Sequence, residues 1–529
     1  MSLTSASFFI FILIGMIIYY LIPRRFQWIV LLGLSAVFYL SSGVTSIIFI
    51  TFSIVTVWVA GRILKKISSV ASAKIKEGKE TLSLNDKKLI RKKAASSKKT
   101  VMAITLILNF GILFVSKYYN FLVDGACNIW GDSLGAYRLS SLIVPLGLSF
   151  YTFQSAAYLL DIYWDKIEPE ENIARYALFI SFFPQLIQGP IGRYSHLSKQ
   201  LNSEHEFDYN SVKSALILML WGYFKKLVLA NRLAPLVDEV FDNPGSHTGI
   251  IVIVAVLAYS VQQYCDFSGG IDVIMGVAEL FGIKLTENFK RPYFSRSLAE
   301  FWRRWHISLG AWMRDYVFYP LAMTKYVDKI SKFCAKKFSE RAYVIAQMTI
   351  CNIAVFLLVG IWHGPEMHYV IWGLYNGIVI AIGAIMEPVI TNFREKRGIK
   401  DNSLGFIIVS ILWTFLIVNF GWFFDRSSTV SGAFTLIKSV LTNFGLSDFG
   451  LSSLSGLGLN IKDYCKVAYG VILLFGVSLT EEIKGISVRE KIVSSKRWIQ
   501  WPIIYILIFT FAAFAVSTEG TTAFMYAQF

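Results

Sequence analysis

The 529-residue chain has few charged residues. Asp, Glu, Lys and Arg together make up 16% of it, against about 25% in an ordinary soluble protein. Hydrophobic residues make up 55%. A soluble chain of this length would form several domains, each with a polar surface. The composition does not supply enough charge to cover such surfaces, and this excludes an ordinary soluble multidomain protein.

Cysteine is scarce as well. The five cysteines are scattered, and no two of them form a Cys-x-x-Cys pair. Disulfide-rich and metal-binding domains usually show such spacings, so we expect neither a disulfide framework nor a metal site. The sequence also lacks a Walker loop, a Gly-x-Ser-x-Gly motif and a His-Glu-x-x-His motif. Nothing in it therefore indicates a familiar soluble nucleotide-binding or hydrolase site.

Long apolar runs dominate the chain instead. Several approach or exceed the roughly 20 residues that cross a bilayer as a helix: residues 6–23, 26–41, 44–62, 343–362, 404–424 and 499–517. We therefore predict an all-α, polytopic integral membrane protein of the plasma or inner membrane, with about eleven spanning helices and lipid as its first partner. Residues 176–192 contain Pro184 and Gly189-Pro190, which break helices. They predict a re-entrant segment.

The formal net charge of +16 is gathered in short segments between the apolar runs. In a soluble protein such a charge would suggest nucleic acid. Basic loops between spans follow the positive-inside pattern instead, so we expect no nucleic-acid partner. The densest run, residues 64–99, predicts a basic cytoplasmic loop. The same asymmetry predicts that Ser517–Phe529 lies outside the cytoplasm.

The segment most informative about chemistry is Glu300–Tyr316, with the sequence EFWRRWHISLGAWMRDY. Placed on one continuous helix, its polar and aromatic residues fall on opposite faces, with His306 at the boundary. An amphipathic helix at the membrane interface explains this pattern as well as a helix lining a cavity does. Ionisable residues at membrane depth cost roughly 2.5–3.5 kcal/mol each, which favours a function for them. The candidate supporting residues are Glu300, Arg304, Trp305 and Asp315.

A second histidine ends an apolar run in Ile361–Pro365, IWHGP. A lone histidine at a helix end is more often structural. Here Gly364-Pro365 predicts a sharp helix break around His363, and the pKa of imidazole suits proton exchange near neutrality. His363 is therefore the candidate general base, Trp362 is a candidate supporting residue, and His306 could meet His363 in space.

Asp266 is an acid in an apolar setting, within Tyr264–Gly270 (YCDFSGG). Two roles are equally consistent with the sequence. The carboxylate could orient a catalytic partner, or it could simply hydrogen-bond with Ser268.

Residues 266–321 resemble the signature region of the membrane-bound O-acyltransferase (MBOAT) family, and in particular the branch of the bacterial alginate O-acetyltransferase membrane subunit. Further blocks are similar to that branch in the same order along the chain: Val144–Tyr158, Ser181–Tyr194, Gly222–Leu233, Gly360–Gly364 and Met525–Phe529. The resemblance is patchwise but spans most of the chain. It implies one transmembrane domain over residues 1–529, with a signature region, residues 266–385, that holds both candidate histidines.

The resemblance also implies roles. The family's essential histidine falls on His363 and its supporting histidine on His306. A cytoplasmic acyl donor, a central tunnel through the membrane and an outer acceptor are implied as well. Gly270 and Pro365-Glu366 depart from the pattern of the branch and leave the choice of substrate open.

We therefore expect an O-acyltransferase that moves an acyl group, most simply acetyl, from a cytoplasmic thioester to an extracytoplasmic hydroxyl during cell-surface polysaccharide modification. The donor would be acetyl-CoA or an acyl carrier protein, with no bound cofactor. A separate extracytoplasmic protein would accept the acyl group. His306 would hydrogen-bond the thioester carbonyl or orient the acceptor, and Arg304 would pair with Glu300 and Asp315. The alternatives are a D-alanyl transferase of the teichoic-acid type, a transporter and a membrane scaffold. The last two leave both histidine blocks unexplained.

Overall fold

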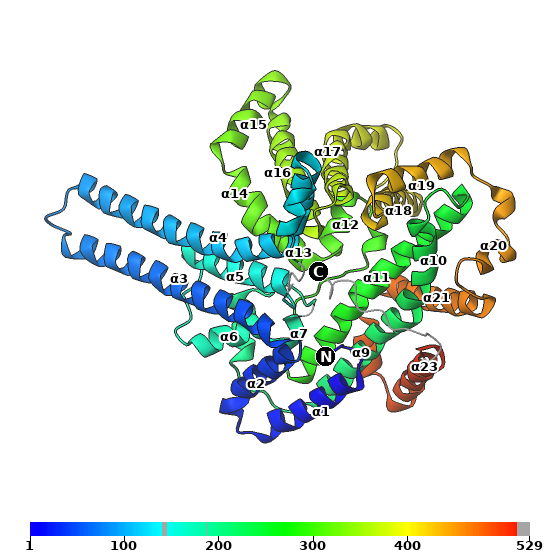
Figure 1. Cartoon of the computed structure of the whole chain (residues 1–529), viewed down its shortest axis with the longest axis horizontal. Coiled ribbons are helices and arrows are strands. Elements are labelled where there is room, and N and C mark those ends of the chain that lie inside the picture. Colours follow the sequence, from blue (N-terminus) through cyan, green and yellow to red (C-terminus); the bar gives the residue numbers. More distant parts are fainter. Residues whose placement is uncertain (140–144, 187, 516–529) are drawn as a thin grey trace. The chain divides into compact units, whose positions relative to one another are not determined.

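The computed structural model describes residues 1–139, 145–186 and 188–515 (Figure 1). The chain divides into two compact units. Among the described residues, the first comprises those within 1–209 and 277–286, and the second comprises those within 210–276 and 287–515. Within the described ranges both units are helical, and the only β-type pairing is an isolated bridge. The single domain implied by the resemblance stays a prediction.

Seven helices in the described residues are long and apolar enough to cross a membrane. They are α3 (Val44–Glu77), α4 (Leu84–Trp130), α11 (Gly249–Leu280), α16 (Glu340–His363), α17 (Met367–Lys396), α18 (Leu404–Arg426) and α21 (Ile461–Lys484). Three shorter apolar helices accompany them: α1 (Ala6–Leu21), α19 (Val430–Thr442) and α23 (Arg497–Ala515). The predicted all-α, multi-pass membrane class is confirmed. Fewer long spans are found than the eleven expected, because some apolar runs form helices of 16 residues or fewer, such as α1.

The first unit packs its shorter helices around a core of aromatic side chains. Almost every residue of α5 (Leu148–Tyr163) is buried, and the rings of Tyr176 and Tyr194 both lie against the ring of Tyr158. Besides α1, α3 and α4, the elements are η1 (Arg24–Phe26), α2 (Gln27–Leu40), η2 (Asp132–Tyr137), α5 (Leu148–Tyr163), α6 (Ile173–Ser181), α7 (Phe183–Leu186) and α8 (Tyr194–Leu201).

Residues 64–99, expected as a basic loop, are mostly helical. The helix α3 continues to Glu77, and α4 begins at Leu84. Ser83 and Asp86 form a capping box that starts α4, a strong local helix signal. The two helices run side by side as a hairpin in Figure 1. The basic residues therefore lie on two helix ends joined by a short turn, and their cytoplasmic location stays a prediction.

The predicted break within residues 176–192 is confirmed. The helix α6 ends at Ser181, and the short α7 holds Pro184. Side chains from other elements bind the backbone of this region: Ser35 Oγ accepts a hydrogen bond from Phe183 N at 3.1 Å, and Gln154 Nε2 donates to Phe179 O at 2.8 Å. Irregular backbone inside a membrane protein needs such internal partners. Whether the segment is re-entrant stays a prediction.

The second unit carries both candidate histidines. Two of its long helices, α16 and α17, pack closely because glycines face the contact: a Cβ on Gly373 would collide with the Phe356 carbonyl. The remaining elements of this part of the chain are α9 (Tyr209–Tyr223), η3 (Phe224–Ala230), α10 (Asn231–Asp242), η4 (Pro292–Phe294), α12 (Leu298–Arg304), α13 (Ile307–Met313), η5 (Arg314–Phe318), α14 (Tyr319–Ala322), α15 (Lys325–Lys337), η6 (Leu446–Asp448), α20 (Leu451–Ser455) and α22 (Val488–Ser494). The predicted outer tail Ser517–Phe529 lies outside the described residues.

Candidate active site

Glu300–Tyr316 is not the one continuous helix that the sequence predicted. The helix α12 ends at Arg304, Trp305 is extended, His306 adopts the left-handed conformation with φ 47° and ψ 53°, and α13 then begins. The prediction was wrong because a neighbouring segment competes for the backbone. Phe289 forms an antiparallel bridge with Trp305. Tertiary hydrogen bonds thus override the helical pattern.

Two further backbone bonds fix this break. Lys290 N donates to Arg304 O at 2.9 Å, and Ile307 N donates to Asn288 O at 3.0 Å. Residues 288–290 therefore run beside residues 304–307 like a short strand. This arrangement brings Asn288 next to His306.

His306 is a buried side chain, only 4% exposed. Its Nδ1 lies 3.2 Å from Asn288 Oδ1, and its ring meets that of Phe267 edge to face, with centroids 4.8 Å apart. His306 lies outside the seven long spans. Burial, and to a smaller extent the nearby His363, lowers the pKa of His306 to about 3. The imidazole is therefore neutral at physiological pH.

His363 is the last residue of α16, and the helix ends there as predicted. The side chain is half-buried. Its ring contacts those of Trp362, Tyr369 and Trp372, with centroid distances of 4.9, 5.9 and 5.1 Å. The ring of Trp372 contacts both His363 and Trp302, with centroid distances of 5.1 and 5.5 Å, so the fold brings His363 near the segment that carries His306. Their catalytic roles stay predictions.

The predicted aromatic residues belong to the packing around these histidines. Trp305 is 3% exposed, and its ring stacks on Phe301 at 5.5 Å. Trp362 is 8% exposed and adjoins His363. Trp302, which the sequence did not single out, donates from Nε1 to Asn376 Oδ1 at 3.0 Å and thereby joins α12 to α17. Large rings thus pack around both imidazoles, of which His306 is buried and His363 is half-buried.

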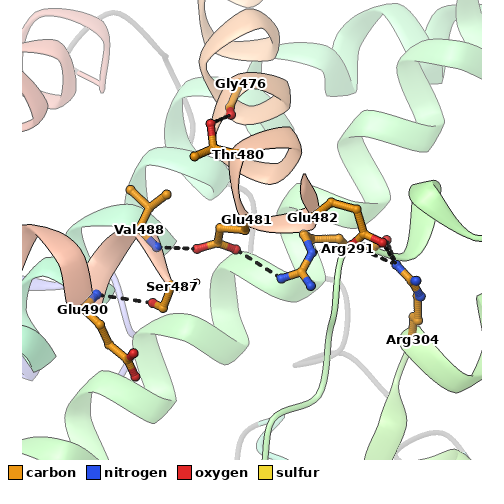
Figure 2. A network of polar contacts seen from close by, with 9 residues as sticks. All are labelled: Arg291, Arg304, Gly476, Thr480, Glu481, Glu482, Ser487, Val488 and Glu490. Carbon is orange, nitrogen blue, oxygen red and sulfur yellow. Dashed lines mark hydrogen bonds and ion pairs between the residues drawn. The ribbon is translucent and has the colours of Figure 1, made fainter. Parts of the chain in front are cut away.

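A network of ion pairs anchors α12 (Figure 2). Arg304 Nη2 binds Glu300 Oε1 at 2.7 Å, as the sequence predicted. Arg304 also binds Glu482 on α21 at 3.0 Å, and Arg291 Nε donates to the same carboxylate at 2.7 Å. The sequence missed Glu482 and Arg291. The signal that could have found Glu482 is the pair Glu481-Glu482 near the end of the candidate membrane span α21, where carboxylates require cations.

Asp315 does not extend this network in the way the sequence predicted. Its partner is the neighbouring Arg314, whose Nε lies 3.0 Å from Asp315 Oδ1. The expected pairing with Arg304 assumed one helix from residue 300 to residue 316. The break at residues 305–306 places the two residues on separate elements.

Asp266 has a partner that neither sequence-based role included. It is buried and forms an ion pair with Lys226, which is fully buried on η3. The predicted partner, Ser268, accepts a hydrogen bond from Lys225 at 2.9 Å, and Lys225 also pairs with Asp272 at 2.8 Å. The ion pair compensates the buried charge of Lys226, and a role of Asp266 in orienting a catalytic partner stays a prediction.

The other histidines have different surroundings. His196 is exposed. His368 is buried and donates from Nδ1 to Phe424 O at 2.8 Å, which is a structural hydrogen bond. Within the described ranges, no group of three or more His, Cys, Asp or Glu residues could hold a metal ion.

The fold and the site define a class: a multi-pass, all-α membrane protein with two neighbouring histidines enclosed by aromatic rings. The family model for MBOAT, the membrane-bound O-acyltransferase family, matches residues 170–335. "Probable alginate O-acetylase AlgI" of Pseudomonas syringae pv. tomato is 32% identical over 382 residues, which cover 71% of this chain and 67% of the relative. The protein of the same name in Pseudomonas putida is 30% identical, over 80% of this chain and 83% of the relative.

The similarity extends to a relative whose name gives another substrate. "Peptidoglycan O-acetyltransferase" of Helicobacter pylori is 30% identical, over 68% of this chain and 67% of the relative. The chain belongs to the membrane-bound O-acyltransferase family. It is therefore a membrane O-acyltransferase.

Proposed function

We propose that this enzyme transfers an acetyl group from acetyl-CoA in the cytoplasm to a hydroxyl outside the cell membrane, for modification of a cell-surface polysaccharide. The observation that carries the proposal is the pair His306 and His363, which the fold brings together from segments 57 residues apart (363 − 306). Aromatic rings enclose the pair. Acyl transfer to a hydroxyl needs a proton acceptor in such a shielded place.

The chemistry assigned to His363 is general base catalysis. The imidazole takes the proton of the acceptor hydroxyl as its oxygen attacks the thioester carbonyl. The C–O bond forms, the C–S bond breaks, and the proton passes to the leaving thiolate of coenzyme A. Such a base typically contributes about 10²–10⁴-fold to the rate. No cofactor is required, because the thioester supplies the driving force.

A basic groove between α3 and α4, in the first unit, supports the proposal that the acyl donor binds on the cytoplasmic side. Its volume is 730 Å³. Four cations line it: Lys76, Lys79, Arg91 and Lys98. Lys98 is held in place by Asp165, at 3.0 Å. A groove of this charge suits the phosphates of coenzyme A or the acidic surface of an acyl carrier protein.

The acceptor side would be supplied by a second protein. The expected outer segments of the chain are short, and the described part of residues 443–460 forms only η6 and α20. Such short segments offer little surface for binding a polysaccharide. An extracytoplasmic partner would accept the acyl group and pass it to a glycan. The relatives named for alginate and for peptidoglycan acetylation support a cell-surface polysaccharide as the final acceptor.

A D-alanyl donor is the second candidate, since "Teichoic acid D-alanyltransferase" of Streptococcus thermophilus is 28% identical over 52% of this chain. Purified protein in lipid vesicles would be given labelled acetyl-CoA, or labelled D-alanyl carrier protein, together with a soluble polysaccharide and the partner. We expect label transfer, and thiol release, from acetyl-CoA. Transfer only from the D-alanyl carrier would replace the donor, and no transfer from either would refute the proposal.

A further inference from the structure

Asn288 is a buried residue whose side chain connects His306 to the start of α13. It is 0% exposed. Its Oδ1 lies 2.9 Å from Ser308 N, 2.9 Å from Ser308 Oγ and 3.2 Å from His306 Nδ1. The amide oxygen of Asn288 therefore has three hydrogen-bond partners, all in the segment that carries His306.

The backbone determines which way this amide faces. The N–H of Ser308 can only donate, so the atom that it meets must be an acceptor. The opposite orientation of the amide would place the NH₂ group of Asn288 against that N–H. The atom of the amide that faces Ser308 N is therefore the oxygen.

The same oxygen determines the state of His306. An amide oxygen accepts and never donates, so His306 Nδ1 must carry a hydrogen to bond with it. A neutral imidazole has one N–H only, and burial keeps this imidazole neutral. The lone pair of His306 is therefore on Nε2. A histidine in this state cannot polarise a thioester carbonyl, which would need an N–H at Nε2.

The amide itself is poorly satisfied at this position. Among the described residues, no hydrogen-bond partner is found for Asn288 Nδ2, although the atom is buried. A buried donor without a partner lowers stability. An apolar side chain of the same shape would avoid that loss but would remove the acceptor of the Ser308 N–H. The amide is therefore used for its acceptor oxygen, which serves both Ser308 and His306.

We propose that Asn288 is a positioning residue that holds His306 as the Nδ1–H tautomer, so that His306 acts in acyl transfer as a hydrogen-bond acceptor. This rests on the proposed function. The titratable group that interacts with His306 is His363, while Asn288, Ser308 and Phe267 are neutral. In this role the lone pair on Nε2 would accept a hydrogen bond from the N–H of His363 as that imidazole takes up the hydroxyl proton. Of the two roles left open by the sequence, this tautomer is incompatible with polarisation of the carbonyl by Nε2, whereas orientation of the acceptor stays a prediction.

The direct test is ¹⁵N NMR of the full chain in lipid, with ¹⁵N-labelled histidine. The spectrum of His306→Gln identifies the His306 signals by their loss. We expect a protonated Nδ1 and an unprotonated Nε2 on His306, and a mixture of tautomers in Asn288→Leu. Protonation at Nε2 in the wild-type protein would overturn the proposal. The spectrum needs no substrate, so it tests the tautomer of His306 independently of the proposed transferase activity.

Activity provides the second arm. Asn288→Leu should lower kcat on the order of 10²-fold, with the KM for acetyl-CoA close to wild type. Asn288→Asp, which keeps an acceptor oxygen, should restore most of the activity. Asn419 is a matched control: it is buried, its Oδ1 accepts from Ser260 Oγ at 2.8 Å, and it lies on α18. Asn419→Leu should keep kcat. A folded Asn288→Leu enzyme with normal kcat would refute the role of Asn288.

Discussion

At the scale of single residues, the position of a histidine in the backbone matters as much as its identity. His363 ends a helix, whereas His306 occupies a left-handed turn between two short helices. A non-glycine residue with positive φ is uncommon and is often tied to function. Both histidines are thus held by features other than ordinary helix packing, and their substitutions should affect chemistry more than folding.

His363→Ala should abolish acyl transfer while the protein stays folded. The half-buried ring lies at a helix end, so its loss removes a proton acceptor more than a part of the core. The rate should fall by about 10²–10⁴-fold, the usual contribution of a general base. The rate of acyl transfer is measured as release of thiol from acetyl-CoA. Monodispersity in detergent shows whether the variant is folded. His196→Ala, on an exposed residue, is the control. A well-folded His363→Ala enzyme with normal turnover contradicts the assignment.

His306→Gln should keep more activity than His306→Ala. Glutamine offers an oxygen that can accept a hydrogen bond near the position of the imidazole Nε2, and alanine offers none. The comparison is made by kcat at saturating acetyl-CoA, because the loss should concern the chemical step rather than donor binding. Equal kcat values in the two variants would show that the hydrogen-bonding capacity of this side chain is irrelevant.

At the scale of elements, close helix packing positions the site. His363 on α16 and Trp372 on α17 are in contact, and glycines permit this approach. Gly373 lies where a Cβ would collide with the Phe356 carbonyl, whereas Gly383 on the same helix has nothing within 4 Å of such a Cβ. The two glycines thus form a matched pair that separates packing from helix propensity.

Gly373→Ala should lower the thermal stability of the enzyme and its activity together, because α16 must move away from α17. Gly383→Ala should be neutral or slightly stabilising, since alanine favours a helix over glycine by about 1 kcal/mol. Thermal unfolding in detergent, followed by tryptophan fluorescence, measures both. If Gly373→Ala were as stable as Gly383→Ala, the close approach of the two helices would be wrong.

The elements also show what sequence reasoning can and cannot reach. The break after His363 was predictable because Gly364-Pro365 is a local signal, and so was the ion pair between Glu300 and Arg304. The break at His306 could not be predicted, because it depends on pairing with residues 288–290. No local sequence pattern indicates that pairing. For the same reason Asn288 and Glu482 were missed, while the periodicity of residues 300–316 pointed to a helix.

At the scale of the whole molecule, the sidedness of the chain decides where the donor enters. Positive charge in residues 64–99 predicts that the hairpin of α3 and α4 faces the cytoplasm. In a cysteine-free background, a cysteine at the exposed Glu80 should resist an impermeant thiol reagent in intact cells. A cysteine at the exposed Ser447, expected outside, should react. The reverse labelling pattern would show that the hairpin of α3 and α4 lies outside the cytoplasm, away from a cytoplasmic donor.

If the hairpin is cytoplasmic, its groove should govern the affinity for the donor. Lys76→Glu combined with Arg91→Glu replaces two exposed cations of the groove with anions. The KM for acetyl-CoA should rise roughly tenfold at low ionic strength with little change in kcat, since the histidines are untouched. Screening by salt should narrow the difference, because it weakens interactions between exposed charges. Lys462→Glu, an exposed change at the start of α21, is the control. An unchanged KM in the double variant would mean that coenzyme A binds elsewhere, because two inverted charges in its path would repel its phosphates.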